Sequence, residues 1–511
     1  MSREKSKARS QKVRMSSSPS GRISLPAGSG TLLECLRLMG YHLRADCGGE
    51  GQCGKCRVRF LSLPPSPDSI EQQWLAAEEL RGGWRLACRH RPPEPAVLEY
   101  GDDWQVRFRP EPISSISARR RLGLAVDIGT TGLVAALVNL DGGDPVLIAR
   151  GFNPQRAWGA DVMTRLVAAR DPQTLSQLQQ AILQAIEAAF STLHKPIPAA
   201  KLYRDLILAV GNTAMIHLAA GIPETTLSVS PFRSPLEGQP ILPLPLGENS
   251  FRLAGPIQGY VGSDHLAVLE FLAPHRNNLG PTLIMDLGTN SEIALWDGKT
   301  YWVTSCAAGP AFEGGGISCG APAAPGVATG IARNDQSWRL LPPAKEPKTG
   351  LCGSALISLL GQLVCSGKMR RDGKLRSGSE EVLQSCHPRL ALTQKDVRAL
   401  QLAKGAIHTG IVMLSRRAGL ALKDVAKVVI TGAFARDLNE QDLKEIGLVP
   451  ADTKEVSFIN DGALQGAAKA LSKQGEPFAE LRPLIRVINL VEEPDFQEEF
   501  LEGLELKPRA E

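Results

Sequence analysis

Two stretches of this chain share one pattern of apolar and polar positions. In each, an apolar run ends at an aspartate, a turn rich in glycine and hydroxyl or amide side chains follows, and a second apolar run begins. The copies are LGLAVDIGTTGLVAAL at 122–137 and TLIMDLGTNSEIALW at 282–296. Apolar runs separated by such turns predict strand–turn–strand hairpins. Because Asp127 and Asp286 lie 159 positions apart (286 − 127), about one domain's length, the repetition predicts two similar lobes.

The turn of each hairpin is suited to binding phosphate. Glycine lets the backbone approach a ligand closely, and free backbone N–H groups and hydroxyls can then bind a phosphate group. An aspartate at the end of a strand can hold Mg²⁺ directly or through water, so Asp127 and Asp286 are the predicted catalytic residues. The predicted phosphate-binding residues are Gly129, Thr130, Thr131 and Gly132 in the first hairpin and Gly288, Thr289 and Asn290 in the second.

A different stretch combines cysteine with glycine. Its cysteines, with a later one, follow the spacing Cys-x5-Cys-x2-Cys-x31-Cys, and they are Cys47, Cys53, Cys56 and Cys88. Three thiolates on one loop and a remote fourth suit a [2Fe–2S] cluster. A zinc site would favour two separated Cys-x2-Cys pairs, of which only one is present, so zinc and the absence of any metal are the weaker interpretations. Residues 21–108 resemble the plant- and adrenodoxin-type [2Fe–2S] ferredoxins, which implies a β-grasp fold.

Composition narrows the class of protein. The 511 residues are 43% hydrophobic and 22% charged, which predicts a globular chain of several domains. We expect no membrane partner, because no apolar run is long enough to span a bilayer. The basic start lacks the apolar core of a secretory signal, and the ten unevenly spaced cysteines do not form a disulfide framework. These features favour the cytoplasm.

The remaining chain divides as follows. Residues 1–20 are predicted to be a disordered basic tail without the context of a nucleic-acid site, so we expect no nucleic-acid partner. A last strand at 104–108 should end the ferredoxin-like domain, and the Pro- and Arg-rich residues 109–121 should be a linker. Strands and helices then alternate through lobe 1, at 122–280, and lobe 2 with a C-terminal tail, at 281–511. The predicted fold class is therefore α+β and α/β, in several domains.

Five features in this order resemble the superfamily of acetate kinase, sugar kinases, Hsp70 and actin. In its terms they are phosphate 1, connect 1, phosphate 2, the adenosine loop and connect 2, at 127–132, 211–213, 286–290, 431–434 and 461–466. The resemblance implies two ribonuclease-H-like lobes that bind ATP and Mg²⁺ in one cleft. It implies that Gly432 and Ala433 approach the adenosine, although this superfamily usually has Gly-Gly there.

A ferredoxin-like segment joined to such an ATPase is similar to the reductive activators of corrinoid proteins. Matching stretches include 47–56, 153–155 with 159–162, 260–262, 306–316, 351–354, and 487–490 with 494–497. The resemblance implies an ATP-dependent enzyme that returns the inactive Co(II) corrinoid of a methyltransferase system to Co(I), passing electrons through a [2Fe–2S] cluster. Its partners would be the corrinoid protein and an external low-potential electron donor, and a homodimer is expected. The short linker indicates that an extra middle domain carried by some members is missing.

Other functions stay open from the sequence. An activator similar to those of 2-hydroxyacyl-CoA dehydratases would use the same ATPase, but such activators usually hold a [4Fe–4S] cluster between subunits. A redox-sensing protein whose nucleotide site switches conformation is another alternative, and a small-molecule kinase is the weakest because it would not use the cluster. Three acids carry no assigned role: Asp161 and Asp264, which are most simply helix caps, and Glu313, in a glycine-rich loop that is either near a ligand or on the surface.

Overall fold

The computed structural model describes residues 21–25, 30–92, 96–100, 104–113, 121–196, 202–223, 227, 233–237, 239, 241–246, 249–274, 280–334, 337–343, 346–386, 389–432, 435–473 and 475–508. The predicted tail 1–20 lies outside these residues. Contacts within the chain define two compact units, 1–264 with 467–477 and 265–466 with 478–511. Within the described ranges, none of the helices combines the length and the apolar character needed to cross a bilayer.

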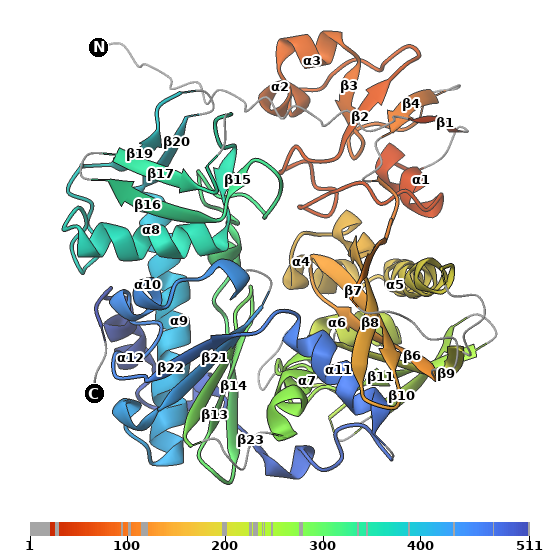
Figure 1. The fold of residues 1–511 in the computed structure, drawn as a ribbon. Helices are drawn as coiled ribbons and strands as arrows, with labels where there is room; N and C mark the ends of the chain where they lie inside the picture. The colour runs from red at the N-terminus through yellow and green to blue at the C-terminus, as the bar shows by residue number, and fades with distance from the viewer. Residues whose placement is uncertain are drawn as a thin grey trace. The chain divides into compact units, whose positions relative to one another are not determined.

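The first unit begins with a small sheet whose strands follow the antiparallel order β1-β4-β2-β3 (Figure 1). Helix α1 starts where Thr31 and Glu34 form a reciprocal capping box, and its Leu32, Leu33 and Leu36 are buried in the core of this small domain. The elements are β1 (Gly21–Leu25), α1 (Leu32–Leu38), β2 (Arg57–Phe60), α2 (Glu71–Trp74), α3 (Ala77–Arg81), β3 (Trp84–Leu86) and β4 (Ala96–Tyr100).

Two local predictions for this region are wrong. No strand forms at 104–108: Trp104 has helical backbone and residues 105–108 are irregular, although Trp104 and Phe108 are buried as their apolar character suggested. The linker expected at 109–121 contains β5 (Arg109–Pro112), which pairs antiparallel with β8 of the following sheet. The prolines of β5 misled the prediction, because an edge strand tolerates proline on the side that needs no ladder hydrogen bond.

The larger sheet of the first unit has the strand order β10-β11-β9-β6-β7-β8-β5. Its central strands β6, β7 and β8 form an antiparallel meander, and β9 and β11 continue from β6 in parallel. The long helix α5 is amphipathic and packs its apolar face into the core of this unit. The elements are β6 (Leu122–Ile128), β7 (Gly132–Asn139), β8 (Asp144–Phe152), η2 (Pro154–Ala157), α4 (Val162–Ala168), α5 (Pro172–His194), β9 (Leu202–Gly211), α6 (Thr213–Ala220), β10 (Ile241–Leu246) and β11 (Asn249–Ala254).

The second unit repeats this connectivity. Its sheet has the order β22-β21-β12-β13-β14-β23, with β12, β13 and β14 as the antiparallel meander and β21 and β22 parallel to β12. Helix α9 packs on β13 and β14 (Figure 1). The elements are β12 (Thr282–Asp286), β13 (Ser291–Trp296), β14 (Tyr301–Cys306), η4 (Pro310–Glu313), α8 (Gly353–Cys365), α9 (Gln394–Ala418), η5 (Leu422–Asp424), β21 (Lys427–Thr431), η6 (Ala435–Asp437), α10 (Glu440–Glu445), β22 (Glu455–Phe458), η7 (Arg482–Leu484), β23 (Ile485–Val487), η8 (Leu490–Glu492) and α12 (Phe496–Gly503).

Smaller elements complete the second unit. Three short strand pairs are β15 (Val327–Ala328) with β18 (Gly350–Leu351), β16 (Gly330–Asn334) with β17 (Ser337–Leu341), and β19 (Glu380–Gln384) with β20 (Leu390–Thr393). The division between the units falls within α7 (Ser263–Leu272) and α11 (Gly462–Ser472). The repeated order of meander and parallel strands confirms the prediction of two lobes of one fold.

Candidate iron–sulfur and nucleotide sites

The four predicted cluster cysteines come together as two pairs. The Sγ atoms of Cys56 and Cys88 lie 3.4 Å apart, although the residues are 32 positions apart in the chain. The Cys47 and Cys53 side chains also interact with each other. Because each iron of a [2Fe–2S] cluster takes two of the four thiolates, this pairing matches the donor set that the cluster needs. The described residues contain no group of three or more His, Cys, Asp or Glu that could hold a single metal ion.

The local environment favours ionisation of one thiol in each pair. The hydrogen bond from Cys56 lowers the pKa of the Cys88 thiol to about 7 despite its burial, and the same contact raises the pKa of Cys56. Burial opposes ionisation of Cys47, but hydrogen bonds from the backbone of Gly49 and neighbouring residues lower its pKa overall. Burial raises the pKa of Cys53. Metal ligation requires thiolates, and these contacts favour the thiolate form of Cys47 and Cys88.

Two glycines of the loop have positive φ angles. Gly54 has φ +62°, and a Cβ added to it would lie 2.8 Å from the ring of Trp74. Gly49 has φ +120° and lies against Leu33 and Cys88. Gly54 therefore has no space for a side chain, the positive φ disfavours one at Gly49, and backbone N–H groups donate to the Cys47 thiol. The residues present fit a [2Fe–2S] cluster.

The first predicted phosphate loop follows β6 in the first unit. Asn153 holds this loop from both sides of the turn: its Nδ2 donates to the carbonyl oxygen of Gly129 at 2.9 Å, and its backbone N–H donates to that of Thr131 at 2.9 Å. The Asn153 side chain is fully buried. The loop is therefore fixed by a residue that the sequence indicated only as part of a matching stretch.

The predicted connect 1 segment also reaches the first loop. Asn212 caps helix α6 by accepting from the backbone N–H of Met215 at 3.0 Å, and its Nδ2 donates to Oγ1 of Thr130 at 3.0 Å. Asp127 lies at the end of β6 and is partly exposed, and Gly132 begins β7. The structure thus brings the first loop and the N-terminus of α6 together, a combination suited to an anion.

The second predicted loop lies in the second unit, after β12. Oγ1 of Thr289 donates to Oε1 of Glu313 at 2.9 Å, and the carbonyl oxygen of Thr289 accepts from the N–H of Gly309 at 2.9 Å. Glu313 is the last residue of η4. Because both Glu313 and Gly309 bond to Thr289, the glycine-rich loop lies against the second predicted phosphate loop. Sequence reasoning noted Glu313 without a role, and the density of glycine around it was the signal.

The predicted adenosine loop and connect 2 contact the second predicted phosphate loop through β21. The backbone N–H of Leu287 donates to the carbonyl oxygen of Thr431 at 3.0 Å, and Oγ1 of Thr431 accepts from the N–H of Gly462 at 3.3 Å. Gly432 has φ +118°, and a Cβ added to it would lie 2.3 Å from the carbonyl oxygen of Leu287. Ala433 lies outside the described residues. Within the second unit, three segments far apart in sequence therefore adjoin.

The two aspartates occupy equivalent places. Asp127 and Asp286 each lie near the C-terminal end of the first strand of a meander, β6 and β12, and both are partly exposed. Asp161 has a structural role, because its carboxylate accepts from the backbone N–H of Thr164 at 2.9 Å and from its hydroxyl at 2.8 Å as the N-cap of α4.

Comparison with known proteins places these sites in one family. Residues 280–510 match the family model described as the C-terminal domain of RACo, the ASKHA domain, and residues 122–276 match the RACo middle region. Residues 18–93 match the 2Fe–2S iron–sulfur cluster binding domain. The corrinoid activation enzyme RamQ of Eubacterium limosum is 30% identical over 416 residues, which cover 74% of this chain and 69% of RamQ. The chain belongs to the RACo family.

Two further proteins are similar to this chain. The [Co(II) methylated amine-specific corrinoid protein] reductase of Methanosarcina barkeri is 28% identical over 233 residues, covering 41% of this chain and 42% of that protein. The solved structure of a reductive activator for corrinoid, iron–sulfur protein covers 94% of this chain and 96% of its own, with a TM-score of 0.66 and 24% identity, which supports the fold. Contrary to the expectation that a middle domain is missing, the family's middle region is present at 122–276.

Proposed function

We propose that this RACo-family protein is an ATP-dependent reductive activator that returns the Co(II) corrinoid of a methyltransferase corrinoid protein to Co(I). The observation that carries the proposal is the presence, in one chain, of two thiol pairs suited to a [2Fe–2S] cluster and two phosphate loops on repeated lobes. The names of the relatives support the same activity, since they describe activation or reduction of corrinoid proteins.

The chemistry explains why a redox domain and an ATPase are joined. A one-electron step costs about 1.4 kcal/mol for each ~59 mV that the acceptor lies below the donor. The Co(II)/Co(I) couple has a very low potential, so an ordinary ferredoxin-type centre is a poor donor to it. ATP helps only if the nucleotide-bound protein has a differential affinity for a form of the corrinoid protein that is easier to reduce.

We assign the following roles to residues. The cluster, when bound, supplies one-electron transfer, and the side chains that hold it are Cys47, Cys53, Cys56 and Cys88. Asp127 and Asp286 hold Mg²⁺ or position water, and Glu313 shares the second site through Thr289. The residues that bind the phosphates are Gly129, Thr130, Thr131, Gly132, Gly288, Thr289 and Asn290, and those that approach the adenosine are Gly432 and Ala433.

The proposal includes partners and a compartment. An external low-potential protein or reductant must supply electrons, and the acceptor is a corrinoid protein. A homodimer is proposed from the resemblance alone. All ten cysteines are free thiols, which supports a reducing compartment such as the cytoplasm.

The decisive experiment is anaerobic. The reconstituted protein is mixed with a low-potential reductant and a Co(II) corrinoid protein from the same genome, and Co(I) absorbance is followed with and without Mg-ATP. Co(I) that forms only with Mg-ATP supports the proposal. Asp286→Ala should abolish this ATP-dependent formation of Co(I), while the visible spectrum of the cluster persists. An intact reducible cluster and measurable ATP hydrolysis without Co(I) would mean that the acceptor belongs to another class.

A further inference from the structure

A partly buried arginine links the cluster loop to the ATPase lobe within the first unit. Arg37 lies in the last turn of α1, and its Nη2 donates to the carbonyl oxygen of Gly48 at 3.0 Å and also to that of Ala157. The guanidinium carbon lies 5.1 Å from the centroid of the Trp158 ring, which is only 3% exposed. One side chain therefore contacts the backbone beside Cys47 and the η2 region together.

Backbone contacts flank this arginine. The N–H of Ala45 donates to the carbonyl oxygen of Arg156 at 3.3 Å, and the N–H of Ala160 donates to that of Asp46 at 3.2 Å. Gly48 has φ +71°, and a Cβ added to it would lie 3.1 Å from the carbonyl oxygen of Trp158. The start of the cluster loop is thus seated directly on the backbone of residues 153–161, which we call the bridge segment.

The other end of the bridge segment is fixed to the first phosphate loop. Asn153, its first residue, makes the two hydrogen bonds to Gly129 and Thr131 described above. Gln155 is fully buried and donates from Nε2 to the carbonyl oxygen of Leu178 in α5 at 3.0 Å. Arg165, also fully buried, donates from Nε to the carbonyl oxygen of Gly159 at 2.9 Å. A segment held at both ends and in its middle moves as one piece or not at all.

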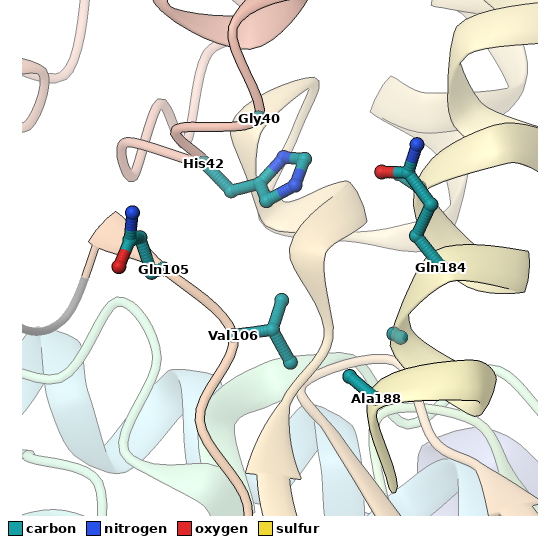
Figure 2. Close-up of a pocket in the computed structure, with 8 residues that line it drawn as sticks. Gly40, His42, Gln105, Val106, Gln184 and Ala188 are labelled. Atoms are coloured by element: carbon teal, nitrogen blue, oxygen red, sulfur yellow. The ribbon is translucent and has the colours of Figure 1, made fainter. Parts of the chain in front are cut away.

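A pocket of about 250 Å³ lies between the ferredoxin-like region and helix α5 (Figure 2). His42 and Gly40 line it from the ferredoxin-like side, and Gln184 and Ala188 of α5 line it from the other. In Figure 2 the side chains of His42 and Gln184 lie on opposite sides of this space. The bridge segment, by contrast, provides close polar contact with the cluster loop.

We propose that the bridge segment couples the first phosphate loop to the cluster loop, with Arg37 as the positioning residue, so that nucleotide binding changes the environment of the [2Fe–2S] cluster. This inference rests on the proposed function, because it requires nucleotide at Gly129 and Thr131. A phosphate that draws the loop toward itself pulls on both hydrogen bonds of Asn153. The bridge segment then shifts against Arg37 and Gly48.

The charge of Arg37 makes such a shift consequential. Burial lowers the pKa of Arg37 to about 10, an effect opposed by Glu34 and by the nearby thiols of Cys56, Cys88 and Cys47, so the side chain stays cationic at neutral pH. A cation in a partly buried site stabilises the more negative, reduced state of a neighbouring cluster. Displacing Arg37 therefore changes the midpoint potential of the cluster.

The test uses the full-length reconstituted protein. Spectroelectrochemistry gives the midpoint potential of the cluster, and EPR gives the spectrum of its reduced form, each with and without a non-hydrolysable Mg-ATP analogue. The variant is Arg37→Met, which keeps an apolar stem but loses the charge and both donors. The matched control is Arg59→Met, because Arg59 also lies in the ferredoxin-like domain and donates to a carbonyl oxygen, that of Gly82 at 3.1 Å.

We expect the nucleotide to shift the potential in the wild type and in Arg59→Met, and the shift to be lost in Arg37→Met although its visible spectrum and nucleotide binding persist. Hydrogen exchange should rise about tenfold in peptides covering 44–49 and 157–161 of Arg37→Met, which detects loosened docking even if the cluster is perturbed. A wild type that binds nucleotide without any shift, or an Arg37→Met protein that keeps it, overturns the inference while the Co(I) assay decides the function separately. Absence of nucleotide binding overturns both.

Discussion

Gly432→Ala is expected to impair ATP turnover through a contact that only the folded chain contains. The added Cβ would lie 2.3 Å from the carbonyl oxygen of Leu287, whereas real Cβ atoms keep at least 3.0 Å, so something must move by at least 0.7 Å (3.0 − 2.3). Leu287 stands between Asp286 and Gly288 in the second phosphate loop. A displacement approaching 1 Å in a catalytic arrangement lowers turnover by about 10²-fold. We therefore expect kcat/KM for ATP to fall by that order.

Gly298→Ala supplies the matched control for backbone strain. Gly298 has φ +100°, close to the +118° of Gly432, but nothing lies within 4 Å of the position that its Cβ would take. Backbone strain alone should cost each variant about 1–2 kcal/mol of folding stability, because both substitutions force alanine into the left-handed region. Only Gly432→Ala adds the contact with Leu287.

Two measurements separate the effects. Denaturant unfolding gives the loss of stability, and a steady-state ATPase assay gives kcat/KM for ATP. Gly298→Ala should lose stability but keep kcat/KM within about twofold of the wild type, since its turn lies outside the phosphate loops. If Gly432→Ala had the same kcat/KM as Gly298→Ala, the strain would be relieved away from the nucleotide, and the assignment of this loop to adenosine would be wrong.

Three further predictions follow from the site and its surroundings. Glu313→Gln keeps an acceptor for the hydroxyl of Thr289 but removes the charge, so kcat for ATP hydrolysis should fall about 10²-fold with a smaller change in KM; an unchanged kcat would exclude a catalytic role. Cys53→Ala should lose the visible spectrum of the [2Fe–2S] cluster while ATP hydrolysis continues, and a normal spectrum would refute its assignment as a ligand. Burial lowers the pKa of His42 to about 4, so this histidine stays neutral in the folded state at pH values where it binds a proton in the unfolded chain. The free energy of unfolding should therefore fall by up to about 3 kcal/mol as the pH drops from 6.5 toward 4. Denaturant unfolding at several pH values should show that this part of the pH dependence vanishes in His42→Leu.

Local patterns predicted the elements that depend on short-range chemistry. Thr31 and Glu34 form the capping box of α1, and the apolar positions of α5 form one buried face, because neighbours along the chain determine caps and amphipathic faces. Helices α2 and α3 are separate elements, since the backbone of Leu75 is extended between them. Strand β5 was missed because its pairing partner, β8, lies more than thirty residues further along the chain.

The sequence by itself determined the repeated aspartate hairpins and the two lobes, and it predicts the four cysteine ligands, since each is encoded in residues close together or in a spacing that recurs. Only the tertiary structure decided which distant residues complete the sites. Asn153 contacts Gly129 of the first loop, and Glu313 contacts Thr289, each across 24 residues of sequence. Arg37 contacts Ala157 of the bridge segment across 120 residues. Such contacts depend on how the chain packs, which no local pattern of polar and apolar positions specifies.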